Sequence, residues 1–286
     1  MDEKEFHRLI KEAEKKLKKA GIDSAAAEVE IILEYLLEVE RIDLYLHGAR
    51  LIDNKIREQF DRIIDKRTTR YPLQYILGEM YFYGRKFMVT PEVMVPTPET
   101  ELLCDLAINY IRNEGIGEPD ILDVGTGSGV IAVTIACELP DSFVTALDIS
   151  PGALTIAHKN AGEYEVASRI EFVESNAFTE VRADRKYELI LSNPPYISDD
   201  EYKGLPPEVL ADPKISLVSG PKGLDFIAML VGRAPDFLKK KGRLMFEIGY
   251  NQADLVAEMT EKDSRYHSIS IFKDLNDIDR VVILSI

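Results

Sequence analysis

The chain of 286 residues has no tryptophan, only two cysteines and only four histidines. Two cysteines cannot form a disulfide framework, and both Cys104 and Cys137 lie in apolar segments where a small buried side chain is expected. The histidines are scattered without the spacing that metal ligands show. We therefore expect neither a structural disulfide nor a bound metal.

Long apolar runs are also absent from the chain. No stretch approaches the roughly 18 apolar residues that a membrane-spanning helix requires. The first residues, Met1-Asp2-Glu3-Lys4, are charged and are not followed by the apolar segment of a secretory signal. These absences predict a soluble cytoplasmic protein.

Positive charge is scarce, because the chain has 35 Lys and Arg but 50 Asp and Glu, which gives a formal net charge of −15. Proteins that bind by neutralising phosphates carry a basic face, so we expect no stable nucleic-acid binding. Two lysine clusters are exceptions. The pattern predicts that 15–19 lies on the solvent side of a helix and that 239–241 ends a helix.

The spacing of apolar residues divides the chain into three parts. Residues 1–75 show helical periodicity and predict a small helical bundle that serves recognition or packing. Residues 76–98, rich in aromatic side chains and glycine, predict a hairpin linker. Residues 99–286 form the remaining domain, and Thr97 and Pro98 are placed to cap its first helix.

Strand-like runs alternate with helical stretches in this last part. They lie at 120–124, 143–147, 170–173, 187–192 and 243–248, the pattern of a doubly wound, mostly parallel α/β sheet. Two further runs, at 267–272 and 280–286, predict an antiparallel hairpin at the edge of that sheet.

A glycine-rich segment, Gly125-Thr126-Gly127-Ser128-Gly129, follows the first of these strands and precedes a helix. Glycines let the backbone turn sharply and approach a ligand closely, although tight packing of a strand on a helix also selects them. Asp148, nineteen residues further on, ends the next strand and is placed to bind ribose hydroxyls. Together they favour a nucleoside-bearing cofactor, and the order of glycines disfavours nicotinamide. Asn176 ends the third strand, where an adenine contact and a simple turn are equally compatible with its position.

The fourth strand delivers Asn193-Pro194-Pro195-Tyr196 to the carboxyl edge of the sheet, where ligands of open α/β sheets bind. Two prolines stiffen the segment and leave its carbonyls free, and Asn193 adds a side-chain acceptor. An exposed Tyr196 would offer an aromatic face. This cradle suits methyl transfer to a planar amide, because acceptors orient the nitrogen and stabilise positive charge developing on it. A proline-rich turn capped by asparagine is the structural alternative.

These motifs resemble those of the class I S-adenosylmethionine methyltransferases. More closely, nearly the whole chain resembles the release-factor glutamine N5-methyltransferases (the HemK/PrmC family), also in the segments 72–78, 95–101, 205–209, 223–225 and 246–249. The resemblance implies a Rossmann-like methyltransferase domain with an N-terminal helical bundle that grips the protein substrate. It also implies transfer of a methyl group from S-adenosyl-L-methionine to the glutamine side-chain amide of the Gly-Gly-Gln motif in peptide chain release factors.

The same resemblance assigns roles to single residues. The cofactor-binding set is Asp123, Gly125, Thr126, Gly127, Ser128, Gly129, Asp148, Asn176, Ala177 and Asn193; the catalytic set is Asn193, Pro194 and Tyr196; and the substrate-binding set is Asn193, Pro194, Pro195 and Tyr196. Three positions depart from the family's usual residues. Thr97 replaces an arginine, Asn176 an aspartate, and Ala177 an aromatic residue.

Three other functions are compatible with parts of this pattern. An adenine-N6 methyltransferase uses the same tetrapeptide on a flipped or single-stranded base, but the acidic balance disfavours it. A ribosomal-protein glutamine methyltransferase is closer and is not separated by these residues. A non-catalytic cofactor-binding adaptor is disfavoured by the intact tetrapeptide at 193–196.

Overall fold

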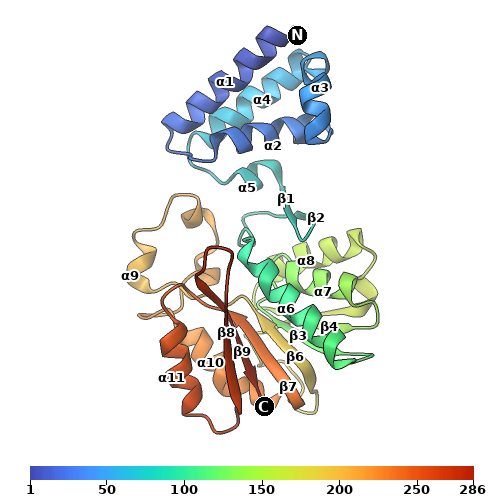
Figure 1. Ribbon diagram of the computed structural model, residues 1–286, viewed down its shortest axis with the longest axis vertical. Helices are drawn as coiled ribbons and strands as arrows, with labels where there is room; N and C mark the ends of the chain where they lie inside the picture. The colour runs from blue at the N-terminus through green and yellow to red at the C-terminus, as the bar shows by residue number, and fades with distance from the viewer. The chain divides into compact units, whose positions relative to one another are not determined.

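The computed structural model describes all residues from Met1 to Ile286, which form two compact units (Figure 1). One unit comprises Met1–Glu79 together with Pro206–Ala211, and the other comprises Met80–Leu205 and Asp212–Ile286. The helical unit therefore includes a short segment from far along the chain that no local pattern assigned to it. The domain limits predicted from the sequence stay predictions. No helix combines the length and the apolar character that crossing a bilayer requires.

The first unit is a bundle of helices around one apolar core. Its helices are α1 (Glu3–Lys19), α2 (Ala25–Leu37), α3 (Arg41–Leu51), α4 (Asn54–Arg67) and the short α5 (Leu73–Leu77). Helix α1 buries Phe6, Leu9, Ala13 and Leu17, which recur every three or four residues and so lie on one face. Asp2 caps this helix by accepting a hydrogen bond from the backbone N–H of Glu5 at 2.8 Å.

Two arginines attach the segment 206–211 to this bundle. The Arg67 Nη1 donates to Glu208 Oε1 at 2.9 Å, and the Arg70 Nη2 donates to Glu208 Oε2 at 2.7 Å. The Arg67 Nε also donates to Glu28 at 2.6 Å, and its side chain is only 6% exposed. Burial opposes ionisation of Glu208, but the hydrogen bonds from Arg70 and Arg67 outweigh it and lower the pKa of that carboxyl to about 2.

The second unit contains a seven-stranded sheet of order β5-β4-β3-β6-β7-β9-β8. Its strands are β3 (Asp120–Val124), β4 (Phe143–Asp148), β5 (Ile170–Glu174), β6 (Tyr187–Ser192), β7 (Leu238–Glu247), β8 (Ser268–Lys273) and β9 (Asp279–Ser285). The first five are parallel, and β9 pairs antiparallel with both β7 and β8. This confirms the mostly parallel α/β sheet and its C-terminal antiparallel hairpin. A separate two-stranded sheet joins β1 (Glu79–Phe82) and β2 (Arg85–Met88).

One sequence interpretation is wrong in this sheet. The lysines at 239–241 do not end a helix but lie within β7, which begins at Leu238. Lys239 Nζ contacts Asp120 at 2.9 Å and Glu188 at 2.7 Å, so carboxylates of the parallel strands, distant in sequence, neutralise it. Helix α6 (Glu99–Glu114) also begins one residue later than expected, with Pro98 rather than Thr97 at its N-cap.

Helices cover both faces of the sheet (Figure 1). Helices α6, α7 (Val130–Glu138) and α8 (Pro151–Glu163) pack on one face, and α10 (Asp225–Arg233) and α11 (Ala253–Glu261) pack on the other. The core side chains alternate accordingly, since Ile121 and Met245 face the first layer while Leu122 and Leu244 face the second. The remaining helices are α9 (Asp199–Tyr202) and four 3₁₀ turns, Ala167–Arg169, Val209–Ala211, Lys214–Ser216 and Ala234–Asp236.

The ion pairs of Glu208 make a testable contribution to the stability of the helical unit. Glu208→Gln removes the charge that two arginines share, one of them nearly buried, and we expect a loss of about 1–3 kcal/mol in the free energy of unfolding near neutral pH. Because the folded pKa is depressed, this stabilisation is present above the ordinary glutamate pKa and is lost as the pH falls towards about 2.

Urea unfolding followed at several pH values measures this difference. The matched control is Glu58→Gln, whose partner Arg62 lies 3.4 Å away and is mostly exposed, so its effect should be close to zero. Equal unfolding midpoints for the Glu208 variant and the control would show that the segment is not held by these charges.

Candidate active site

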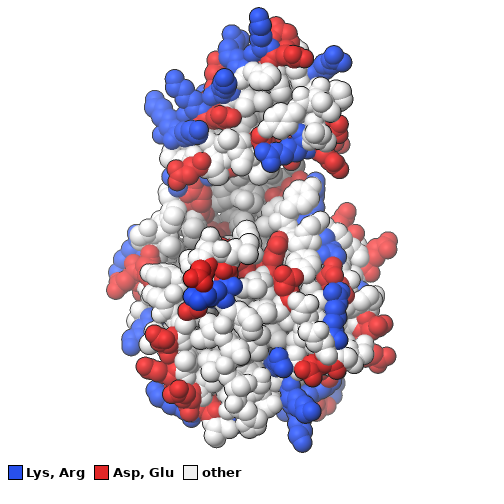
Figure 2. Space-filling view, viewed as in Figure 1, with Lys and Arg blue, Asp and Glu red and all other residues white.

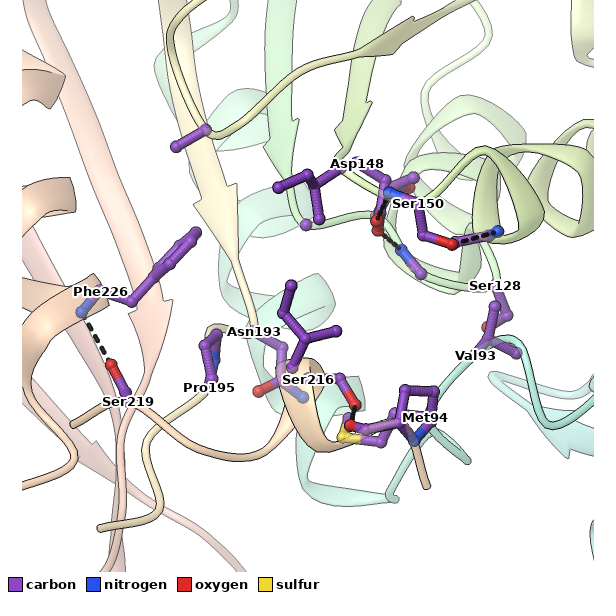
Figure 3. A pocket seen from close by; sticks show the side chains of 18 of the residues that line it. Val93, Met94, Ser128, Asp148, Ser150, Asn193, Pro195, Ser216, Ser219 and Phe226 are labelled. Carbon is purple, nitrogen blue, oxygen red and sulfur yellow. Dashed lines mark hydrogen bonds between the residues drawn. The ribbon is translucent and has the colours of Figure 1, made fainter. Parts of the chain in front are cut away.

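A cavity of about 490 Å³ opens at the carboxyl ends of the parallel strands in the second unit (Figure 3). Strand β3 lies between β4 and β6, so chain connections leave its two sides in opposite directions. Such a point in the strand order creates a crevice, and this volume is typical of small-molecule sites. The walls come from the loops that follow β3, β4, β5 and β6 and from the segment around α10.

The three glycines of the loop after β3 serve two purposes. Gly125 and Gly127 line the cavity with φ values of +78° and +56°, and a Cβ added to either would meet no atom within 4 Å. Gly129 has φ +82°, but its added Cβ would lie 3.0 Å from the backbone of Ala157 in α8. The first two thus leave an open backbone surface for a ligand, whereas the third allows the loop to pack on a helix.

Asp123 lies beneath this loop rather than on the cavity wall. It is fully buried, and its Oδ2 accepts a hydrogen bond from Thr126 Oγ1 at 2.7 Å while Oδ1 has no partner. Burial raises the pKa of this carboxyl to about 7. Thr126 and Ser128 do line the cavity, and the buried Ser128 hydroxyl also lacks a partner.

Asp148, at the end of β4, lines the cavity with its carboxylate fixed by two backbone groups. Its Oδ2 accepts the N–H of Gly127 at 2.8 Å, and its Oδ1 accepts the N–H of Ser150 at 2.9 Å (Figure 3). Burial raises the pKa of the Asp148 carboxyl, which these two bonds partly oppose. A carboxylate offers about four lone-pair positions, so capacity for ligand hydroxyls remains.

Asn176 and Ala177 follow β5 and also line the cavity. Asn176 is exposed, whereas Ala177 is buried and has the left-handed φ of +49°, a conformation that non-glycine residues rarely adopt. The neighbouring Ser175 stabilises this turn, because its hydroxyl donates to the Ala177 carbonyl at 2.6 Å and its N–H donates to the Asp148 carbonyl at 2.9 Å. The turn therefore places both residues beside Asp148.

The loop after β6 brings Asn193 and Pro195 to the cavity wall, opposite Asp148 and Ser150 (Figure 3). Pro194 is buried and Tyr196 is half-buried, and neither lines the cavity. The sequence predicted an exposed Tyr196, and this prediction is wrong, because the side chain is half-buried. Burial and the nearby charge of Glu247 raise the pKa of its hydroxyl.

The side-chain amide of Asn193 is paired on one side only. Its Nδ2 donates to Thr100 Oγ1 at 2.9 Å, while Oδ1 is buried and has no hydrogen-bond partner in the protein. An unpaired buried acceptor costs free energy unless a ligand or water satisfies it. The arrangement therefore offers a fixed acceptor at the wall of the cavity.

Residues outside the predicted set hold this loop in place. Gln252 Nε2 donates to the carbonyls of Tyr196 at 2.9 Å and Gly223 at 3.1 Å, and its Oε1 accepts the N–H of Gly249 at 2.8 Å. Gly223, with φ +69°, allows the closest approach, because an added Cβ would lie 2.1 Å from the Tyr196 carbonyl oxygen. The segments around Gly223 and Gly249 carried the family resemblance, but no local pattern identified Gln252.

A second hydrogen bond continues from Thr100 into the core. The Thr100 hydroxyl donates to Glu247 Oε2 at 2.7 Å, joining the first turn of α6 to the end of β7. Both residues fall in segments that resemble the family, yet neither was assigned a role. The strand alternation that points Glu247 towards α6 was the available signal, but the contact itself depends on tertiary packing.

Two family descriptions match the chain. Residues 8–78 match the PrmC N-terminal domain, and residues 104–220 match the Methyltransferase small domain.

Curated relatives match over nearly the full length. The release factor glutamine methyltransferase of Fusobacterium nucleatum is 40% identical over 275 residues, covering 93% of this chain and 75% of that protein. The protein of the same name from Chlorobaculum tepidum is 38% identical over 267 residues, covering 91% of this chain and 90% of its own.

Solved structures show the same fold at low identity. The catalytic domain of hMettl16 in complex with a MAT2A 3′UTR hairpin superposes with a TM-score of 0.58 and is 16% identical, covering 78% of this chain and 80% of that one. At this identity the likeness concerns the methyltransferase fold alone.

Because Gly223 closely approaches the loop after β6, we expect that adding a single methyl group at this position destabilises the folded protein. Gly223→Ala places a Cβ against a backbone carbonyl at a left-handed φ, so we expect at least about 2 kcal/mol of destabilisation. Thermal unfolding should show this as a fall in Tm of about 4–8 °C.

The matched control is Gly232→Ala, in the exposed part of α10, where an added Cβ meets nothing within 4 Å. That change should be neutral or stabilising by up to about 1 kcal/mol. A Gly223 variant as stable as the wild type would contradict the described packing of the loop.

Proposed function

Because the chain belongs to the family of the release factor glutamine methyltransferases, we propose that it methylates the side-chain amide nitrogen (N5) of the glutamine in the Gly-Gly-Gln motif of peptide chain release factors. The methyl donor in this proposal is S-adenosyl-L-methionine. The observation that carries the proposal is the buried Oδ1 of Asn193, which has no hydrogen-bond partner. Asn193 lines a cavity that is also lined by the glycine-rich loop after β3.

The residues around the cavity suit this donor. The open backbone of Gly125 and Gly127 would receive its methionine end, Asp148 would bind the ribose hydroxyls, and Asn176 with Ala177 would border the adenine. The unpartnered hydroxyl of Ser128 supports a polar ligand here. When bound, the donor supplies a methyl group on a positively charged sulfonium.

Asn193 and its neighbours would bind the glutamine amide. An amide –NH2 has two hydrogens, and the Asn193 Oδ1 together with the Pro194 carbonyl would accept them. This orients the nitrogen and stabilises the positive charge that develops on it as the new bond forms. Pro195 would pack against the amide at the cavity wall. Tyr196 would stabilise the conformation of the loop through its backbone carbonyl, which accepts a hydrogen bond from Gln252.

The amide lone pair is delocalised, so positioning matters more than acid–base chemistry in this proposal. The nitrogen–methyl bond would form as the methyl–sulfur bond breaks, with neutral S-adenosylhomocysteine as the leaving group. No strong base is needed before the transfer, because the nitrogen loses one hydrogen as a proton to solvent after the new bond has formed. The protein's contribution is then to fix the amide in line with the methyl group and to exclude water.

The helical unit would hold the release factor away from its Gly-Gly-Gln loop. Helices α2 and α3 expose several large apolar side chains, including Tyr35, Ile42, Tyr45 and Leu46. Exposed apolar side chains of this size can supply the contact area of a protein-binding surface. A release factor partner would also place the enzyme in the cytoplasm.

Charge distribution favours a protein substrate over nucleic acid. The net charge is −15, and on the face shown in Figure 2 Lys and Arg are interspersed with Asp and Glu over the sheet-containing unit. A ribosomal-protein glutamine offers the same amide, so the experiment must compare the two substrates directly.

The direct test is methyl transfer from labelled S-adenosylmethionine to a release factor. We expect label on the intact release factor and none on its variant with alanine for the glutamine of the Gly-Gly-Gln motif, because the acceptor nitrogen is then missing. Ribosomal proteins and duplex DNA serve as alternative substrates, and Asn193→Ala serves as the inactive enzyme. Label on DNA alone, on ribosomal proteins alone, or undiminished on the glutamine variant would overturn the proposal.

Cofactor binding gives a second prediction. Asp148→Asn removes the charge of the proposed ribose acceptor, and hydrogen bonds to charged groups contribute about 1.5–3 kcal/mol, so we expect roughly 10-fold to 100-fold weaker binding of S-adenosylmethionine. Isothermal titration calorimetry measures this. Asp141→Asn, an exposed change on the loop before β4, is the control and should leave Kd unaltered. Identical Kd values for both variants would exclude Asp148 from the binding site.

A further inference from the structure

We propose that Thr100 and Glu247 are positioning residues that fix the side-chain amide of Asn193 with its oxygen towards the cavity. The inference rests on the proposed function, since it explains how the acceptor for the glutamine amide is oriented. It adds two residues that the catalytic tetrapeptide does not contain and that come from distant parts of the chain.

The three residues form one continuous hydrogen-bonded chain. Asn193 Nδ2 donates to Thr100 Oγ1 at 2.9 Å, and the Thr100 hydroxyl donates to Glu247 Oε2 at 2.7 Å. Thr100 is 1% exposed and Glu247 is fully buried, so water does not compete for these bonds. These hydrogen bonds connect the loop after β6 with the first turn of α6 and with the last residue of β7.

Counting hydrogens fixes the direction of this chain. A threonine hydroxyl has one hydrogen, and an ionised carboxylate can only accept. If Glu247 is ionised, the Thr100 hydrogen must point to it, and the Thr100 oxygen can then only accept from Asn193. The NH2 of Asn193 therefore faces Thr100, and its Oδ1 is left without a partner in a residue that lines the cavity.

A neutral Glu247 would remove this constraint. A protonated carboxyl could donate to Thr100, whose own hydrogen could then point to the Asn193 oxygen. The amide would turn over and present its NH2 to the cavity, where it would meet the hydrogens of the glutamine amide. Two donors cannot bond to one another, so this orientation does not bind the substrate.

Several groups around Glu247 bear on its ionisation. Burial, with a smaller contribution from Glu99, raises the pKa of the carboxyl, the Thr100 bond, Arg280 and Tyr196 oppose the increase, and the net result is a pKa of about 7. Cys104 lies one turn further along α6 and interacts with the same carboxyl. Because the ionised form is needed, activity should fall as the pH decreases through about 7, and a variant without this carboxyl should lack that decrease.

The test compares four variants in the release-factor assay. Thr100→Val keeps the shape but removes both hydrogen bonds, so we expect kcat to fall about 10-fold to 100-fold with KM for S-adenosylmethionine changed less than about two-fold. Thr100→Ser restores the hydroxyl and should recover most of kcat. Thr134→Val is the matched control, because Thr134 is equally buried on α7 and its hydroxyl has no partner. Glu247→Gln should lower kcat and abolish the acid limb of the pH profile.

The orientation of the Asn193 side-chain amide can also be measured without an activity assay. In NMR spectra of the intact protein, one side-chain N–H of Asn193 should exchange slowly with solvent in the wild type and in Thr100→Ser, but faster in Thr100→Val. A kcat for Thr100→Val equal to that of the control, or unchanged exchange of this N–H, would overturn the inference. A wild type that does not methylate the release factor but shows slow exchange would count against the proposed substrate. It would still support the positioning of Asn193 by Thr100 and Glu247.

Discussion

In the proposed mechanism, the chemistry of this site depends on the hydrogen bond from Asn193 to Thr100. It uses the NH2 of the Asn193 side chain and leaves its oxygen buried without a partner at the edge of the cavity. An acceptor in that state is already desolvated and held before any substrate arrives. Electrostatic stabilisation of a developing charge is strongest when the groups that provide it do not have to reorganise.

The fold keeps the acceptor in place from three directions. The sheet order places the end of β6 beside β3, so Asn193 faces the glycine loop across the cavity. Gln252 holds the carbonyl of Tyr196 from behind, and Gly223 allows the backbones to come close enough for this. Glu247 reaches Thr100 because residues of β7 alternate between the two faces of the sheet, and its side chain falls on the face covered by α6. Rigidity of the loop thus comes from packing as well as from its two prolines.

Local features of the chain could be predicted from the sequence, and contacts between distant segments could not. The parallel strands, the C-terminal hairpin and the clustering of Asp148 with the glycine loop follow from short-range patterns, since carboxyl ends of parallel strands meet at one edge. The role of Gly129 in packing on α8 needs the neighbour that a Cβ would strike. Lys239 was misplaced because its partners, Asp120 and Glu188, are on other strands. The attachment of the segment 206–211 to the helical unit likewise depends on ion pairs across more than 130 positions.

The most direct measurement is a crystal structure of the enzyme with S-adenosylhomocysteine and a peptide or release factor carrying the Gly-Gly-Gln sequence. The account predicts that the glutamine side-chain nitrogen lies within hydrogen-bond distance of the Asn193 Oδ1, with the Asn193 Nδ2 still bonded to Thr100 and the ribose next to Asp148. A glutamine nitrogen bound elsewhere in the cavity, or an Asn193 amide turned so that its NH2 faces the substrate, would contradict it.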